Sequence, residues 1–349
     1  MKSGLFSSLM LIAGLAVGLG VAPSAASAAP TIIFSTDFEN GVPPEFSGVT
    51  TIEPVQGYAG LGTGVNVFGG NFLRNKSTLV GATNVASKTT LTLNNLPPHT
   101  SIDLSFLLAT IDSWDGYNLC VNSGPDILNV QVDDVIVFKR TFNNSDCNGT
   151  DESGPLGFVL DAGVALARYA NLGFNTADPV FLDSAYDMGR QNQFKKIPHT
   201  SNKLTISWFA SSPTWQAGED ESWAIDNVKV SLNGVYTPVT IDMRPGGSQN
   251  SVNPKNQGIV QVAVLSNSAF NATNVDPTTL RFENGSLTGA PVHASFRDVN
   301  GDRIADLVVH FKTQDTGILC GNTSVTLIGK TYDGLDIKGS DFISTVGCN

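Results

Sequence analysis

Short apolar segments separated by turn-forming residues dominate the chain beyond about residue 30. Runs of Val, Ile, Leu, Thr and Phe alternate with Asn, Gly, Pro and Asp, which is typical of β-strands joined by turns. Leu204, Ile206 and Trp208 alternate with polar residues, so one face of that strand is expected to be buried. The segments expected to form strands include 31–35, 90–93, 102–106, 128–132, 135–138, 204–209 and 224–230.

Helical periodicity is confined to one segment, Ala162–Asn171. Many short strands with turn signals predict an all-β protein built of antiparallel sandwiches. The pattern predicts that one strand ends before Asn233-Gly-Val-Tyr-Thr-Pro238 and that 239–243 begins a new one. We therefore expect a domain at 30–233, a linker at 234–238 and a smaller domain at 239–349, of about 200 and about 110 residues.

The first 29 residues have the pattern of a secretory signal peptide. A basic start at Met1-Lys2 precedes a Gly-rich apolar run, and Ala26-Ser27-Ala28 matches an A-x-A cleavage site. A membrane-spanning helix is the alternative, but the glycines and the processing site disfavour it. Since no second apolar run of about 20 residues follows, we expect a secreted protein, extracellular or periplasmic, without membrane insertion.

The charge balance narrows the range of partners. The chain has a net charge of −11, and loss of Lys2 with the signal peptide leaves 19 basic and 31 acidic residues, or −12. An acidic surface repels phosphate groups, so nucleic acid is not an expected partner. The same surface suits the binding of cations.

Four cysteines follow the signal peptide. An even number in an exported protein predicts disulfides, and the spacing favours Cys120–Cys147 and Cys320–Cys348. Three pairings are possible in principle. A zinc site is disfavoured because the cysteines lack C-x-x-C spacing and neighbouring histidines.

The stretch 298–306 has the ligand order of a calcium loop. Calcium loops place side-chain oxygens at positions 1, 3 and 5, a backbone carbonyl at 7 and a carboxylate at 9. The matching residues are Asp298, Asn300, Asp302, Ile304 and Asp306. Position 6, normally Gly, is Arg303, and position 12, normally Glu, is Val309, so further ligands must come from elsewhere. The alternative is an acidic surface turn solvated by water.

The first domain, about 31–233, resembles bacterial jelly-roll domains of the carbohydrate-binding-module and concanavalin-like type. The resemblance rests on 35–39, 111–116, 124–126 and 220–228. In such folds the first and last strands lie side by side, and acidic residues there often hold calcium. The resemblance therefore nominates Asp37, Glu39 and Asp226, with Glu221 as a possible fourth ligand. A strand-edge carboxylate without metal is the alternative for Asp226.

The second domain resembles a module that recurs at the C-terminus of secreted bacterial proteins. The resemblance rests on 241–246, 253–255, 258–265, 275–282, the calcium loop, 307–311, 315–317 and 339–341. It implies an Ig-like sandwich of roughly seven strands and says little about a ligand. The chain departs from the module's pattern at Met243-Arg244 and at Arg303. The departure at Arg303 bears on the affinity of the loop for calcium and not on the fold.

Catalytic motifs are missing from the sequence. None of the four histidines stands in H-E-x-x-H, and there is no G-x-S-x-G elbow. His99 and His199 share Pro-His-Thr segments, which favours a role in turns. A polysaccharide hydrolase needs only two carboxylates, and 219–221 supplies acidic residues, but no E-x-D-x-x-E pattern is present. We therefore do not expect an enzyme.

Binding is the better interpretation of the aromatic and acidic residues. Aromatic rings stack on sugars, and Trp114, Tyr117 and Trp215 are the candidates for such a platform, with a packed loop anchor as the alternative for Trp114. We expect a calcium-binding protein whose partner is carbohydrate or an extracellular matrix polymer. A structural or adhesive scaffold of the cell surface or biofilm, with a protein partner and no sugar ligand, is the alternative.

Overall fold

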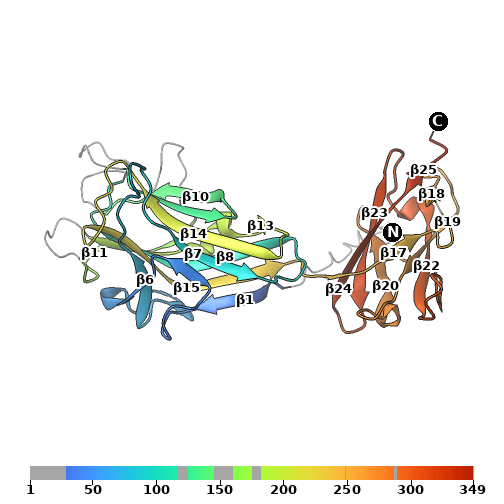
Figure 1. Cartoon of the computed structure of the whole chain (residues 1–349), viewed down its shortest axis with the longest axis horizontal. Coiled ribbons are helices and arrows are strands. Elements are labelled where there is room, and N and C mark those ends of the chain that lie inside the picture. The colour runs from blue at the N-terminus through green and yellow to red at the C-terminus, as the bar shows by residue number, and fades with distance from the viewer. Residues whose placement is uncertain are drawn as a thin grey trace, which may run out of the picture.

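The computed structural model describes residues 29–116, 125–144, 160–174, 182–247, 249–286 and 289–348. The signal-peptide segment, Tyr117, Cys120 and Cys147 lie outside these ranges, so their predicted roles are untested. The described chain is all-β, with only short 3-10 turns, and its strands form two groups (Figure 1). The predicted all-β fold of two sandwiches is confirmed.

The larger sheet of the first sandwich is built around a long antiparallel pair. β8 (Ser101–Asp112) and β15 (Glu221–Asn233) pair from Glu221–Asp112 to Asn233–Ser101. The order of the sheet is β11-β12-β8-β15-β6-β3, and β1 and β13 pair with β15 and β8. The remaining strands are β11 (Ala165–Ala170), β12 (Asp183–Asp187), β6 (Asn71–Asn75), β3 (Thr51–Pro54), β1 (Thr31–Thr36) and β13 (Ile197–Pro198).

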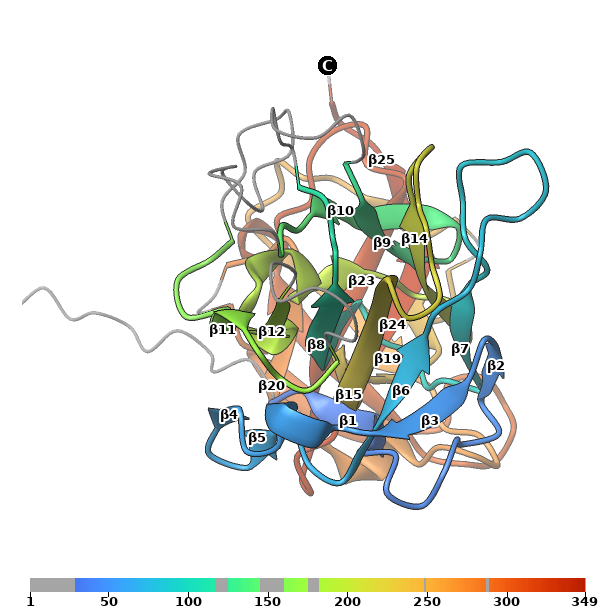
Figure 2. The ribbon, with the colours of Figure 1, turned by 90° about the vertical axis from the view of Figure 1, so that its left-hand side faces the viewer.

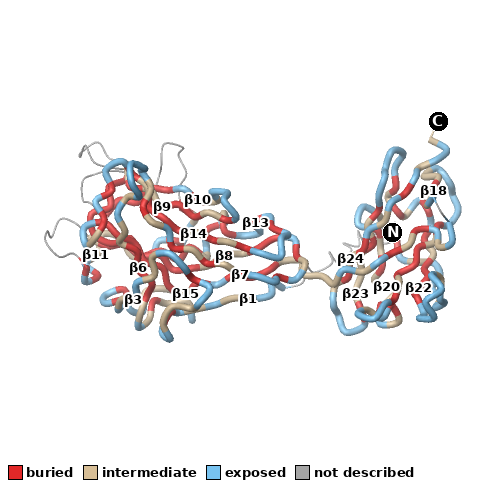
Figure 3. The backbone as a smooth tube through the Cα atoms, viewed as in Figure 1, coloured by how far each residue is buried: buried red, intermediate tan, exposed pale blue. Residues whose placement is uncertain are grey.

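The second sheet of this sandwich has the order β10-β9-β14-β7-β2. Its strands are β10 (Val135–Thr141), β9 (Ile127–Val132), β14 (Lys203–Ser211), β7 (Thr89–Asn94) and β2 (Phe46–Gly48). Leu204, Ile206 and Trp208 of β14 are fully buried, which confirms the alternation expected from the sequence. Figure 2 shows the strands of the two sheets as facing layers, and Figure 3 shows the burial concentrated between them.

The second sandwich has two four-stranded sheets, β16-β24-β23-β20 and β17-β19-β22-β21. β18 (Ser251–Val252) also pairs with β25 (Ser344–Thr345). A separate apolar core lies between the sheets. The predicted Cys320–Cys348 disulfide is present, and its Cα atoms are 5.7 Å apart. The strands are β16 (Thr237–Pro238), β24 (Asp336–Phe342), β23 (Ser324–Thr331), β20 (Val275–Phe282), β17 (Ile241–Met243), β19 (Ile259–Val264), β22 (Asp306–Lys312) and β21 (His293–Arg297).

The segment with helical periodicity, 162–171, contains strand β11, because it pairs with β12 and tertiary pairing overrides weak helical propensity. Thr237–Pro238, at the end of the expected linker 234–238, pairs with β24. Within the described ranges, no helix has the length and apolar content needed to cross a lipid bilayer.

Candidate functional site

The predicted calcium loop forms the turn between β21 and β22. Both oxygens of Asp298 accept backbone hydrogen bonds, from Gly301 at 2.7 Å and from Arg303 at 2.8 Å. Arg303 has φ +70°, the left-handed conformation for which Gly is favoured in turns. The non-glycine residue at position 6 therefore adopts the backbone conformation that glycine would adopt with less strain.

The other loop oxygens are also held by the backbone. Asn300 Oδ1 accepts from the Asp302 amide at 3.0 Å, and Asp302 Oδ1 accepts from the Ile304 amide at 2.8 Å. A carboxylate or amide oxygen has two lone pairs, so each can accept a hydrogen bond and still coordinate a cation. Binding of calcium at this loop stays a prediction.

Asp306 differs from the exposed residues of the loop because its side chain is fully buried. Its Oδ1 accepts from the Ser266 amide at 2.8 Å, and its Oδ2 accepts from the Val299 amide at 2.9 Å. This carboxylate therefore ties the loop to the end of β19, whether or not a cation is bound.

The second predicted acidic group lies where β1 and β15 pair, as expected for the first and last strands. Asp226 is 1% exposed. Burial raises its pKa to about 7, the amides of Asn227 and Gly69 oppose the rise, and the charges of Glu39 and Asp37 add to it. The structure thus places Asp37 and Glu39 close enough to Asp226 for their charges to act on it.

An open cavity of about 220 Å³ lies beside this group. Most of its lining is polar, and Asp37 is part of it. The lining residues are Ser35, Thr36, Asp37, Val65, Asn66, Asn227, Val228 and Lys229. Small-molecule sites usually measure about 300–1,000 Å³, so this cavity suits a ligand the size of a single sugar unit.

The two described residues of the predicted aromatic platform are not exposed. Trp114 is 0% exposed and Trp215 is 7% exposed. Their rings pack edge to face at 5.2 Å, and Trp114 Nε1 donates to the Ser222 carbonyl at 2.6 Å. The prediction that these rings form a surface for stacking on sugars is wrong, because both belong to the apolar core.

The two Pro-His-Thr turns meet in space. His99 Nε2 lies 2.7 Å from His199 Nδ1, and both rings are buried. His199 Nε2 lies 2.8 Å from Asp133 Oδ2, and His99 Nδ1 lies 2.7 Å from the Pro97 carbonyl. These contacts place the histidines in a pair that joins the segments preceding β8 and β14.

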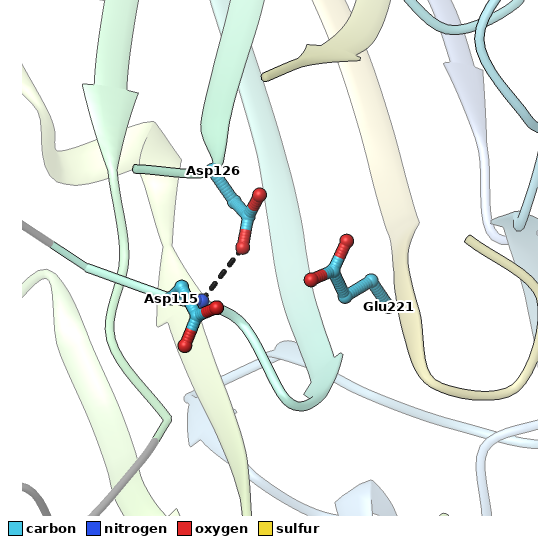
Figure 4. Close-up of side chains that lie close together, drawn as sticks. All are labelled: Asp115, Asp126 and Glu221. Carbon is cyan, nitrogen blue, oxygen red and sulfur yellow. Dashed lines mark hydrogen bonds between the residues drawn. The ribbon is translucent and has the colours of Figure 1, made fainter. Parts of the chain in front are cut away.

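Sequence reasoning missed a third acidic group, which we call the acidic triad: Asp115, Asp126 and Glu221. One oxygen from each lies within 4.8 Å of the others, and among the described residues neither predicted acidic set meets this distance (Figure 4). Their side chains are 4%, 0% and 0% exposed, respectively. Asp115 follows β8, Asp126 precedes β9 and Glu221 begins β15, so sheet pairing brings the three together.

Hydrogen bonds to the backbone shape the acidic triad. The Asp115 amide donates to Asp126 Oδ2 at 2.7 Å, and the Asp126 amide donates to the Asp115 carbonyl at 2.8 Å. Glu221 Oε2 accepts from the Gln216 amide at 2.5 Å. Burial, together with the neighbouring carboxylates, raises the pKa of Glu221 and of Asp126 well above their ordinary values.

The resemblance suggested Glu221 as a possible fourth ligand in the acidic group beside β1. The structure instead places Glu221 in the acidic triad. The members of the acidic triad stand in three of the segments that carried the resemblance, 111–116, 124–126 and 220–228. The presence of an acidic residue in each of these three segments was the signal in the sequence for the acidic triad. It does not reveal proximity, since the pairing of β8 with β15 is a long-range contact.

Comparisons with known proteins leave the family open. No family model matches the chain, and no curated protein matches it. Among solved structures, the dimeric latent PorU from Porphyromonas gingivalis aligns with 84% of this chain, at 11% identity and a TM-score of 0.27. The alignment spans 20% of the PorU chain. A likeness at this level carries no functional argument.

Proposed function

We propose that this is an exported, non-catalytic calcium-binding protein that binds carbohydrate or an extracellular matrix polymer. The observation that carries the proposal is the polar cavity beside Asp37, because it places a small ligand-sized space next to the buried Asp226 and two further carboxylates that act on it. A calcium ion among Asp37, Glu39 and Asp226 would offset their negative charge. Sugar hydroxyls would then meet amide, hydroxyl and lysine groups in the same cavity.

Calcium at the loop 298–306 has a separate, structural role in this proposal. The loop is exposed, its backbone is already shaped, and its side-chain oxygens keep free lone pairs. A cation bound only by the folded state stabilises it by about 3–4 kcal/mol at 100–1,000 times its dissociation constant. Export to a calcium-rich, oxidising compartment agrees with the Cys320–Cys348 disulfide.

A retention assay tests the proposed function. The protein without its first 29 residues is applied to a panel of insoluble polysaccharides and extracted matrix, in calcium and then in EDTA. We expect retention in calcium and release by EDTA or by free sugar. The double variant Ser35→Ala/Lys229→Ala changes two exposed residues of the cavity lining and should reduce retention. Lys139→Ala removes an exposed lysine from the other sheet and serves as the matched control.

Unchanged retention of the cavity variant would place the ligand elsewhere. No retention on any polymer, with a melting temperature that still falls in EDTA, would favour the adhesive scaffold whose partner is a protein or a second copy. Release of soluble sugar from any substrate would contradict the non-catalytic assignment.

A further inference from the structure

Among the described residues, the acidic triad contains a buried oxygen atom without a hydrogen-bond partner. Asp126 is 0% exposed, and its Oδ2 accepts from the Asp115 amide, but its Oδ1 has no hydrogen-bond partner. Figure 4 shows the carboxyl groups of Asp126 and Glu221 turned toward each other. Native proteins rarely leave such an atom without a partner, because its lost hydration is not replaced. A bound cation or a proton shared with Glu221 would supply that partner.

Two members of the acidic triad, Asp126 and Glu221, also have little opposite charge around them. The Glu221 carboxylate accepts hydrogen bonds from the uncharged Gln216, from its backbone amide at 2.5 Å and from its Nε2 at 3.1 Å. The ion pairs formed within the described ranges do not include Asp126 or Glu221. Buried charges of one sign are normally paired with opposite charge or coordinate a metal.

We propose that the acidic triad binds one divalent cation, through Asp126 Oδ1 and one carboxylate oxygen each from Asp115 and Glu221. A cation would satisfy the unpartnered oxygen and offset the negative charge of Asp126 and Glu221. A donor set made only of carboxylate oxygens selects calcium, magnesium or manganese over zinc or copper. Calcium fits best, because it tolerates irregular geometry and additional carbonyl or water ligands.

The bound cation joins three segments at one end of the first sandwich: the residues after β8, those before β9 and the start of β15. This site is separate from the cavity beside Asp37 and from the loop 298–306. It lies next to two buried indoles, because Trp114 precedes Asp115 in the chain and Trp215 precedes Gln216, which holds Glu221. Metal bound there would be close to tryptophan.

Terbium provides a selective probe, since this trivalent calcium mimic emits when a neighbouring excited tryptophan transfers energy to it. All 4 tryptophans of the chain precede residue 224, so the loop 298–306 has none in its own sandwich. The calcium-free protein is titrated with terbium under tryptophan excitation and then with calcium as competitor. We expect a saturable signal that calcium displaces.

Variants assign the terbium signal to residues. Asp126→Asn and Glu221→Gln keep side-chain shape but remove a charged ligand, and each should weaken binding about tenfold or more. Asp37→Asn and Asp298→Asn change the other two candidate sites and should leave the tryptophan-sensitised signal unchanged. A missing signal, or a signal equal in all four variants and the parent protein, would overturn the proposal.

Thermal unfolding followed by tryptophan fluorescence gives a second, independent result. In EDTA, Asp126→Asn should melt at or above the temperature of the parent protein, because it removes like-charge repulsion. In calcium, the parent protein should gain more stability in this transition than Asp126→Asn, which can gain only from calcium bound beside Asp37. A parent protein that gains nothing from calcium, magnesium or manganese would show that Asp126 and Glu221 merely share a proton.

Discussion

Asp306 offers a sharp test of how the second sandwich is held together. Its buried carboxylate receives two backbone amides, Ser266 at 2.8 Å and Val299 at 2.9 Å. Asp306→Ala would leave both donors without their acceptor, the Ser266 amide in a buried position and the Val299 amide in a partly buried one. A hydrogen bond to a charged group contributes about 1.5–3 kcal/mol, so the expected loss of unfolding free energy is about 3–6 kcal/mol. That is a large part of the total of about 5–15 kcal/mol for a typical domain.

The assay exploits the distribution of tryptophan. All four tryptophans lie in the first sandwich, so fluorescence reports that unit, whereas calorimetry reports both. In EDTA, Asp306→Ala should lower the calorimetric transition that has no fluorescence counterpart and leave the fluorescence transition in place. Asp306→Asn retains one acceptor oxygen and should lose about half as much, about 1.5–3 kcal/mol.

Asp302→Ala is the matched control within the same loop. Its carboxylate is exposed, so the loss in EDTA should stay below about 1 kcal/mol, although any calcium-dependent stabilisation should also disappear. The reasoning is refuted if Asp306→Ala in EDTA costs no more than Asp302→Ala. Asp306 would then act only as a calcium ligand.

Three further outcomes are expected from the packing. Replacing both cysteines of the disulfide by serine should destabilise the second sandwich by about 3–4 kcal/mol in calorimetry, because the two cysteines are separated by 28 residues. Gly317→Ala should destabilise the second sandwich far more than Gly334→Ala. Both glycines have positive φ, but only at Gly317 would the new Cβ collide with a backbone carbonyl, that of Asn284. Equal melting temperatures of the two variants would contradict this prediction. Burial raises the pKa of Asp183, so its contribution to the free energy of unfolding is full below its ordinary pKa and falls as the pH rises through the raised value. Asp183→Asn should lose this part of the pH dependence in urea unfolding curves recorded from pH 3 to 8. A pH profile identical to that of the parent protein would contradict this prediction.

The strands and the class of fold could be predicted from the sequence because they depend on local patterns. The alternation of Leu204, Ile206 and Trp208 predicts one buried face wherever the strand is placed. In the structure all three side chains are buried. The spacing of Cys320 and Cys348 likewise identified a local disulfide. The turn at 298–306 could be located for the same reason, since its side chains bond to their own backbone.

Contacts between distant segments were beyond the reach of these patterns. Trp114 stands among polar residues, yet its indole is buried against Trp215, because the chain after β8 folds back over the core. Asp115, Asp126 and Glu221 come together only through the pairing of β8 with β15 and the position of β9. Local sequence therefore determined which segments become strands and turns. The pairing of those strands in the sheets decided which side chains are buried and which carboxylates lie together, because it brings distant segments into contact.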